Sequence, residues 1–335
     1  MLHFILRRLL LLIPVIVGLT IIMFAIARLL PGDPVALAAG PNATQAEIAA
    51  LAVEYGLDKP VWVQYGTYVS GLMHGDLGTS LLTRRPVAAD IKAYLPATLE
   101  LVFAAMFIAV AVGIPLGLIT AVWRNRWPDY LAQVGAIGAI SMPRFFLGLL
   151  LQLCFAMWLM WLPLGGRLPI VVIPPRFVTG FLTIDSLIAG NWNAFLMSLR
   201  HLALPAIAMS LSPLATIMRM MRASTIEVMQ QDYVMTARAL GLPQRKIITK
   251  YVARNAVSAT LTVIGLYFGW LLGGTVLVET VFDWPGLGLY ATKAIVSQDM
   301  MPVIGVALVI GLLFVFANLV IDLLYGVINP KVRYS

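Results

Sequence analysis

The residues most able to carry out chemistry are few in this sequence and lie far apart. The three histidines are His3, His74 and His201, and Cys154 is the single cysteine. A disulfide needs a second cysteine, and a structural zinc site needs about four clustered ligands. The phosphate-binding pattern Gly-x-x-x-x-Gly-Lys-Ser/Thr is also absent. We therefore expect no disulfide, no metal, no bound cofactor and no ATP hydrolysis by this chain, which is not expected to be an enzyme.

A basic segment at 223–254 carries the strongest signal for contact with another protein. Asp232 is the expected N-cap of a first short helix, and Gly241 is expected in the left-handed conformation that ends it. Pro243 fits the start of a second short helix that ends near Arg254. The segment therefore predicts two short helices outside the membrane.

One face of the first short helix carries small side chains. Tyr233, Ala237 and Gly241 recur at four-residue spacing, which places them on the same side. Alanine and glycine let a partner's groove approach the backbone closely, which favours a docking surface. The same segment also fits an ordinary basic connection beside a membrane. Spacing alone leaves both interpretations open.

A second polar segment, Glu279–Tyr290, combines Glu279, Phe282, Asp283 and Trp284 with two glycines. This composition makes it a candidate outer gate or a surface that binds another protein. The alternative is an interfacial turn that Trp284 anchors, because tryptophan is enriched at membrane interfaces.

The elements that must position these residues are almost entirely apolar. The chain has 335 residues, 61% of them hydrophobic, and a mean hydropathy of +0.92, whereas a soluble domain is about 45–50% apolar. A hydrocarbon core of about 30 Å needs about 20 apolar residues in a helix. Apolar stretches of that size occur at about 9–29, 97–122, 132–162, 201–221, 256–278 and 302–325. The sequence predicts an all-α integral membrane protein with about six transmembrane helices, the first an uncleaved span rather than a signal peptide.

Charge asymmetry predicts the orientation. With six spans, one side carries thirteen basic and four acidic residues, and the remainder carries ten basic and eleven acidic residues. The positive side is cytoplasmic in membrane proteins, so both termini and the segment 223–254 are expected in the cytoplasm. The net charge of +8 does not indicate nucleic-acid binding, because the basic residues sit at the ends of apolar segments.

The connections divide the chain into three regions. Residues 1–30 form a tail and the first span, 31–96 form a periplasmic cap, and 97–335 form the transmembrane core. The cap contains an amphipathic stretch, Gln45–Tyr55, although a flexible loop is the alternative. The second outer connection, about 164–200, is too rich in proline and asparagine to form a further span.

Three features within the spans need a structural reason. Pro143 is expected to kink or break the third stretch. Arg144 follows it, and a charge in the bilayer is costly, so this side chain either faces a central path and attracts a carboxylate or snorkels to the cytoplasmic interface. Asn318 and Asp322 are expected to bind backbone or partner groups near the inner surface.

Glycines recur every fourth residue in two spans. They are Gly113 and Gly117 in one, and Gly265, Gly269 and Gly273 in another. Such stripes let two helix backbones approach closely. They fit packing within this chain as well as contact with a partner subunit or the lining of a path.

The stretch DYVMTARALGL, from Asp232 to Leu242, resembles the coupling loop of ABC importer permeases of the dipeptide, oligopeptide and nickel branch. In that family the loop forms a coupling helix in a cleft of the ATPase subunit. The resemblance assigns this contact to Asp232, Tyr233, Thr236, Ala237, Arg238, Leu240 and Gly241, with the alanine and Gly241 at its centre. Met235 departs from the usual acidic residue, and Ala259 stands where a Leu-Pro ending is common.

Further motifs extend the resemblance over nearly the whole chain. They are PGDP at 31–34, LGLDKP before a Gln-Tyr pair, GDLG at 75–78, PATLEL at 96–101, ETVFDWPGLG at 279–288 and DLLYGVINPKVR at 322–333. The likeness is strongest to the first permease subunit of dipeptide transporters. Several motifs in one order are far more specific than any single motif.

The resemblance implies a heteromeric importer in the bacterial inner membrane. Its other parts are a second similar permease, two cytoplasmic ATPase subunits that bind ATP and Mg²⁺, and a periplasmic solute-binding protein. The expected substrates are di- or oligopeptides, while nickel chelates and glutathione use the same machinery. A self-sufficient secondary transporter would show half-chain repeats or ionisable residues deep in several spans, and neither is evident in the sequence.

Overall fold

The computed structural model describes residues 2–29, 44, 46, 53 and 58–328. The PGDP motif, most of the stretch Gln45–Tyr55 and the last residues of the tail lie outside them. In the part of the chain that is described, regular structure is helical apart from one isolated bridge between Thr79 and Pro86. The described helices are α1 (Leu2–Leu29), α4 (Val61–Met73), α5 (Val87–Val122), α6 (Trp127–Ser141), α7 (Arg144–Leu151), the π-helix η1 (Gln152–Trp158), α8 (Leu182–Ile188), α9 (Trp192–Val228), α10 (Asp232–Ala239), α11 (Gln244–Lys246), the π-helix η2 (Ile247–Val252), α12 (Ala253–Gly273), α13 (Val276–Val281), α14 (Leu287–Val296) and α15 (Met300–Ile328).

Four helical stretches in the described residues are long and apolar enough to cross a membrane. They are α5, α9, the continuous stretch Gln244–Gly273 and α15 over Met300–Ile321. A fifth is obtained if α6 and the helix that follows it count as one bent span, and α1 contributes a shorter apolar helix over Leu10–Ile26. The prediction of an all-α membrane protein is confirmed, with four to five candidate spans.

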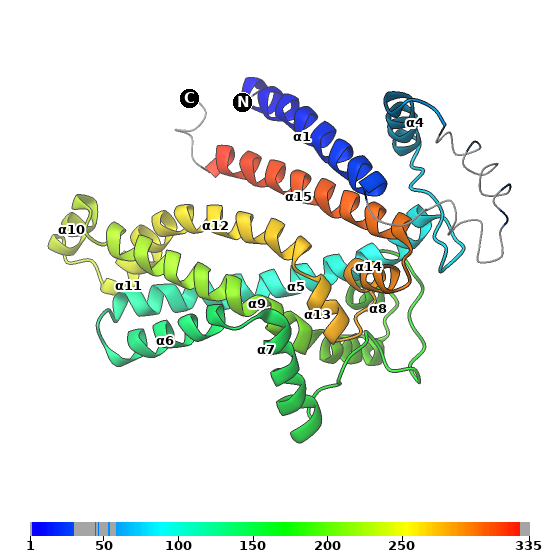
Figure 1. Cartoon of the computed structure of the whole chain (residues 1–335). Coiled ribbons are helices and arrows are strands. Elements are labelled where there is room, and N and C mark those ends of the chain that lie inside the picture. Colours follow the sequence, from blue (N-terminus) through cyan, green and yellow to red (C-terminus); the bar gives the residue numbers. More distant parts are fainter. Residues whose placement is uncertain (1, 30–43, 45, 47–52, 54–57, 329–335) are drawn as a thin grey trace.

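The predicted break at Pro143 is confirmed. α6 ends at Ser141, Pro143 is the N-cap of α7, and the two helix axes meet at 108°. Figure 1 shows α7 turning away from the helices that run along the length of the molecule. The stretch expected at about 132–162 is therefore not one crossing helix, because proline can neither donate the helix hydrogen bond nor fit behind the preceding turn.

The second span begins earlier than its apolar run. α5 starts at Val87, so the last ten residues assigned to the cap, 87–96, are helical. Val87 and Ile91 are buried against Leu287, Tyr290 and neighbouring apolar side chains. This burial extends the helix past the point where composition alone would end it, and Pro96 lies inside it.

The fourth span also begins before its predicted limit. α9 starts at Trp192 rather than near residue 201. The Asn191 side chain accepts a hydrogen bond from the Ala194 N–H at 3.0 Å, as expected of an N-cap. Asn191 is one of the asparagines that argued against a further span in the outer connection. In the structure it ends that connection, because it is the N-cap of α9.

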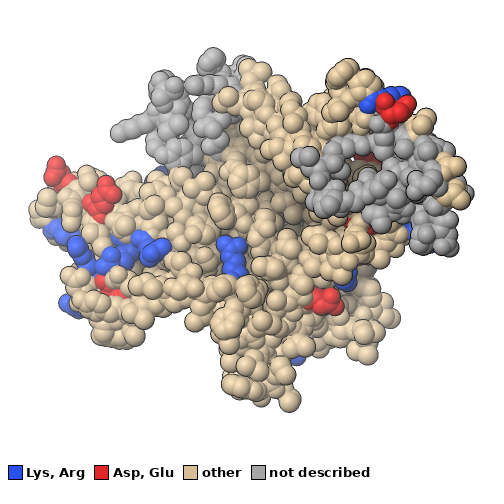
Figure 2. Space-filling model, in the orientation of Figure 1, with Lys and Arg blue, Asp and Glu red and all other residues tan. Residues whose placement is uncertain are grey.

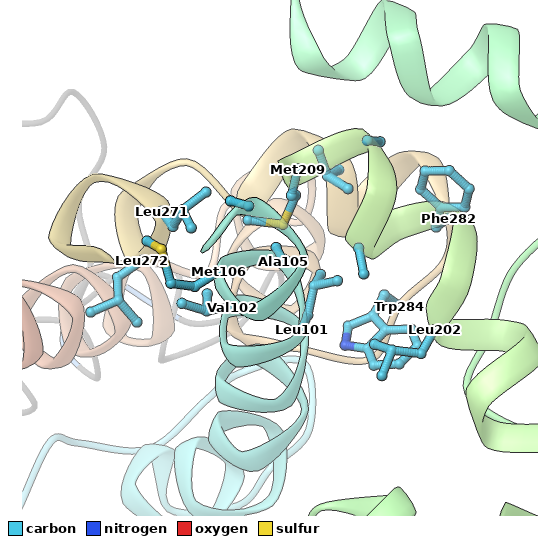
Figure 3. Close-up of a cluster of buried hydrophobic side chains, with 14 of the residues drawn as sticks. Leu101, Val102, Ala105, Met106, Leu202, Met209, Leu271, Leu272, Phe282 and Trp284 are labelled. Atoms are coloured by element: carbon cyan, nitrogen blue, oxygen red, sulfur yellow. The ribbon is translucent and has the colours of Figure 1, made fainter. Parts of the chain in front are cut away.

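The core lies where α5, α9, α12 and the turn after α13 meet. Figure 3 shows Leu101, Met209 and Leu272 with Phe282 and Trp284 in this cluster. The Trp284 side chain is 1% exposed. A span thus buries an apolar face against other helices of the same chain, while its remaining surface stays open to lipid or to other subunits.

α6 is joined to α9 by an ion pair whose carboxylate is buried. Arg222 Nε and Nη2 each donate to an Asp129 carboxylate oxygen at 2.7 Å. Asp129 also accepts from the Asn125 N–H and from Gln133. This bidentate geometry is the strong form of an Arg–carboxylate contact, and it satisfies the buried charge of Asp129.

The glycine stripes are packing surfaces within this chain. A Cβ at Gly117 would lie 2.6 Å from Met221 Cβ, so α5 and α9 touch there through the glycine. Gly265 and Gly269 similarly receive side chains of α15. At Gly273, in contrast, an added Cβ would meet nothing within 4 Å.

This difference gives a matched pair of variants. Gly117→Ala should lower the melting temperature of the detergent-solubilised protein, because overpacking a tight contact costs about 1–3 kcal/mol. Gly273→Ala should leave the melting temperature within error of wild type. Equal melting temperatures for the two variants would contradict close packing of α5 on α9.

Candidate coupling surface and outer turn

The short helix α10 begins one residue earlier than expected. Gln231 is its N-cap, without a side-chain hydrogen bond, and Asp232 is the first helical residue. The prediction of Asp232 as N-cap is therefore wrong. Asp232 already has a helical backbone, and its carboxylate instead lies in the first turn, where negative charge favours the helix dipole.

The end of α10 follows the predicted glycine stop. Gly241 has φ +74°, and its N–H donates to Arg238 O at 2.9 Å, while the Leu242 N–H donates to Ala237 O at 3.2 Å. This pair of bonds is the Schellman arrangement, which needs a left-handed residue at the glycine position. The predicted left-handed Gly241 is confirmed.

The second helix of the segment is not short. It begins after Pro243, as predicted, but α11, η2 and α12 form one uninterrupted helical stretch from Gln244 to Gly273. The end expected near Arg254 is absent, because the helix continues into the apolar span. α10 is therefore followed, after a tight turn, by a single helix that enters the membrane region.

The predicted docking face of α10 is partly turned inward. Ala237 is 5% exposed and packs with Val234, Ile247 and Val252 of this chain. The hydroxyl of Tyr233 accepts a hydrogen bond from the Asn255 amide at 2.9 Å. In this structure the methyl group of Ala237 therefore holds α10 on η2 and is not available to a partner.

The outward surface of α10, which we call the coupling surface, consists of other side chains. Leu240 is 74% exposed and Met235 is 53% exposed. Thr236, Arg238 and Gly241 are also exposed. The missed residue is Met235, and the spacing of the buried Val234 and Ala237 could have indicated that it faces outward.

Positive charge surrounds the coupling surface. Figure 2 shows Lys and Arg gathered at the end of the molecule that carries α10 and α11. The exposed basic residues of this region are Arg124, Arg126, Arg238, Arg245, Lys246, Lys250 and Arg254. An exposed apolar side chain beside such charges is a feature of interaction sites rather than of lipid-facing helices.

At the opposite end of the molecule, the Glu279 side chain caps the interruption between α13 and α14. Its carboxylate accepts hydrogen bonds from Thr98 Oγ1 at 2.8 Å and from the N–H groups of Gly288 and Leu289 at 2.7 and 3.1 Å. The two amides belong to the first turn of α14, which has no cap from Gly286 itself. Burial raises the pKa of the Glu279 carboxyl, while the hydrogen bonds from Thr98 and the amides oppose that shift.

Phe282 and Trp284 are structural residues of this turn. Both side chains are 1% exposed, and Trp284 Nε1 donates to Ala97 O at 2.8 Å. Glu279 is fully buried, so three of the four candidate gate residues have no free surface here. Only Asp283 is exposed, with φ +45°. The structure thus favours the anchored turn, although Trp284 is anchored in protein rather than at the interface.

Two motifs about 180 residues apart form this one contact. Thr98 and Ala97 belong to PATLEL, and they bind the segment ETVFDWPGLG. Glu100 of PATLEL also pairs with Arg167, which in turn lies 5.5 Å from the centre of the Trp284 ring. Thr98, Glu100 and Arg167 were not identified from the sequence as site residues, although two of them lie in a recognised motif.

Arg144 lies far from the coupling surface. Its guanidinium contacts Gly274, at the C-terminal end of α12. Gly274 follows Arg254 by twenty residues, which is about 30 Å of helix and therefore about one hydrocarbon thickness. The side chain of Arg144 is therefore half-buried near the end of the bundle opposite to Arg254.

The remaining predicted polar contacts are simpler. Asn318 Nδ2 donates to Phe314 O at 3.0 Å on its own helix. The side chain of Asp322 lies outside the described residues. In the part of the chain that is described, no three His, Cys, Asp or Glu side chains are placed to hold a metal ion.

Several long apolar helices, with the short helix α10 outside them at a basic end, define a multi-pass membrane protein. Residues 113–334 match the family described as "Binding-protein-dependent transport system inner membrane component", and residues 1–102 match the N-terminal part of such components. The chain belongs to this family. It is a permease component of a binding-protein-dependent ABC importer, located in the inner membrane.

Relatives cover nearly the whole chain. It is 45% identical over 321 residues to the probable D,D-dipeptide transport system permease protein of Escherichia coli strain K12, covering 96% of this chain and 94% of that protein. It is 43% identical over 338 residues to the dipeptide transport system permease protein of Alkalihalophilus pseudofirmus, with both chains fully covered. A glutathione transport system permease protein of Salmonella typhimurium is 38% identical over 335 residues, again with both chains fully covered.

Melting temperatures of variants can show that Glu279 holds the turn together and that Asp283 does not. Glu279→Leu should lower the melting temperature, because it leaves Thr98 and two buried amides without an acceptor at about 1–3 kcal/mol each. Asp283→Asn, at an exposed position in the same turn, should melt like wild type. A Glu279→Leu protein as stable as wild type would show that the carboxylate does not hold the turn.

Proposed function

We propose that this permease imports di- or oligopeptides, as half of a translocation path that a second homologous permease completes. Two cytoplasmic ATPase subunits hydrolyse ATP with Mg²⁺, and a periplasmic solute-binding protein delivers the peptide. The observation that carries the substrate class is identity of 43–45%, over nearly whole chains, to permeases named for dipeptide transport. The chain itself contributes no ATP-hydrolysing residues and binds no cofactor.

Glutathione is the second candidate substrate. The permease named for glutathione transport is 38% identical to this chain over its full length. Glutathione is itself a small peptide with free carboxylates and an amine, so both candidates need the same chemistry along the path. The higher identity to dipeptide permeases favours dipeptides.

The proposed topology has six crossings with both termini in the cytoplasm and residues 31–86 in a periplasmic cap. The basic end with α10 and α11 supports this orientation, because Lys and Arg concentrate on the cytoplasmic side. The turn at Glu279 and the helix α14 are then periplasmic. Arg144 lies toward the outer side of the path, where its charge attracts a peptide carboxylate.

The coupling surface on α10 is proposed to contact the ATPase subunit. Two features of the structure support a mechanical role. Val234 and Ala237 fix α10 on η2, and η2 continues without interruption into α12. Movement of the ATPase subunits against Leu240 and Met235 is therefore passed to a span as a rigid tilt rather than absorbed by a flexible loop.

Cysteine accessibility tests the topology. In a Cys154→Ser background, a cysteine introduced at Asn191 should react with a membrane-impermeant maleimide added outside spheroplasts. A cysteine introduced at the exposed position Gln244 should react only after the membrane is opened. Labelling of the Gln244 position from outside would overturn the proposed orientation.

Two substitutions at Gly241 test the coupling surface. An added side chain there meets nothing within 4 Å, so Gly241→Ala carries only the left-handed backbone cost of about 1 kcal/mol. Gly241→Glu has the same backbone cost and also buries a charge wherever the ATPase covers this surface. We expect near-normal binding-protein-stimulated ATPase activity and peptide uptake for the first variant, and at least tenfold less for the second.

The control for that experiment is assembly in the membrane. Both variants should insert to wild-type levels, and only Gly241→Glu should fail to retain the ATPase subunits on purification. Full uptake by the Gly241→Glu complex would show that α10 is merely a basic connector.

A further inference from the structure

A pocket of about 260 Å³ lies beside the Glu279 turn, at the end of the molecule opposite α10. Its wall is formed by the start of α5, the segment around Arg167, the residues after α13 and one face of α14. The volume is below the roughly 300–1,000 Å³ of sites for drug-sized ligands. It therefore suits a ligand of only a few residues and excludes a folded domain.

The charged groups around this pocket are of both signs. Arg167 is already neutralised by Glu100, which also accepts from the N–H and hydroxyl of Thr183. Lys293 and Asp283 also line the pocket and are exposed, and neither forms an ion pair with another described residue. The available charges are thus one ammonium and one carboxylate, separated along the pocket wall.

The pocket also has a rigid aromatic wall. The rings of Tyr94 and Tyr290 stack with centroids 4.9 Å apart and an interplanar angle of 14°. The Tyr290 hydroxyl donates to Asp90 Oδ2 at 3.0 Å, which fixes the ring. Tyr290 and Leu289 are only 3% and 6% exposed, so they support the wall from behind, and the half-buried ring of Tyr94 is its accessible part. Flat apolar surface beside opposite charges matches a ligand with charged ends and a side chain between or beside them.

Asp283 is held in place by its neighbours. It has φ +45°, a conformation that aspartate tolerates better than most residues, and it lies between the buried side chains of Phe282 and Trp284. The carboxylate is therefore presented from a turn whose two flanks are fixed in the core. Such preorganisation reduces the entropy lost on binding.

We propose that this pocket is a binding site for a short zwitterionic peptide at the outer mouth of the permease. The peptide ammonium pairs with Asp283, the terminal carboxylate pairs with Lys293 beside Arg167, and a side chain rests on Tyr94. The site rests on the proposed function as a peptide importer and adds a place where this chain itself contacts the substrate after delivery.

The test uses the full importer complex in lipid nanodiscs, without the binding protein, and glycyl-leucine as the probe. Isothermal titration should show saturable binding to wild type and at least tenfold weaker binding to Asp283→Asn and to Lys293→Met. Asp58→Asn and Lys92→Met alter exposed charges of the same types outside the pocket and should bind like wild type. Melting temperatures confirm that all four variants are folded.

Blocked peptides assign each end. N-acetyl-glycyl-leucine should bind more weakly than glycyl-leucine to wild type, and Asp283→Asn should weaken it no further. Glycyl-leucinamide should likewise bind wild type more weakly than glycyl-leucine does, and Lys293→Met should weaken its binding no further. Absence of saturable glycyl-leucine binding to wild type, or equal binding by the pocket variants and the controls, would overturn the proposal.

Uptake separates this proposal from the proposed function. With the binding protein present, wild-type vesicles should accumulate labelled glycyl-leucine. If they do so while the pocket variants bind and transport like wild type, the pocket proposal fails and peptide import stands. If wild-type vesicles accumulate no peptide, peptide import itself is wrong.

Discussion

A backbone group inside a membrane protein must find its hydrogen-bond partner within the protein, because hydrocarbon offers none. Continuous helices meet this requirement by themselves, but this chain interrupts its helices at several places. At three of these interruptions a polar side chain binds the backbone groups that the helix leaves open. Glu279 binds the first amides of α14, and Gln152 donates to Leu164 O and Val281 O. His201 Nδ1 lies 2.8 Å from Gly165 O, which closes a further loop.

These contacts all lie away from α10, and they make the two ends of the molecule different in kind. The Glu279 end is a set of short helices and turns that are pinned to α5 and α9 by polar side chains. The α10 end is a small apolar cluster on a helix that continues into the bundle. A polar surface held by side-chain hydrogen bonds can present fixed groups to a small ligand, whereas an apolar cluster on a long helix can transmit movement, as proposed for α10. The two ends differ because backbone N–H and C=O groups are left open between the short helices at the Glu279 end, whereas apolar side chains are left to be covered at the α10 end.

The sequence correctly predicts those features of the fold that depend on the local backbone alone. Pro143 breaks its helix and Gly241 adopts a positive φ because of their own covalent structure, whatever surrounds them. The sequence does not predict the burial of side chains that depends on contacts with distant parts of the chain. Ala237 turns inward because η2 offers an apolar surface, and Trp284 is buried because Ala97, far away in sequence, accepts its N–H. Spacing can place residues on one face, but it cannot say what that face meets.

The π-helical turns of η2 lie between the coupling surface and the span, and they fix the rotation of α10 about the helix axis relative to α12. In a helix each residue adds about 100° of rotation and 1.5 Å of rise. Gaining or losing one residue between Pro243 and Ala253 would therefore turn α10 about a quarter of a revolution relative to α12. Replacements at the exposed positions of η2 leave this setting intact, but length changes do not. Across relatives, the exposed positions of the segment should accordingly vary, while Ile247 and Val252 stay apolar and the number of residues stays constant.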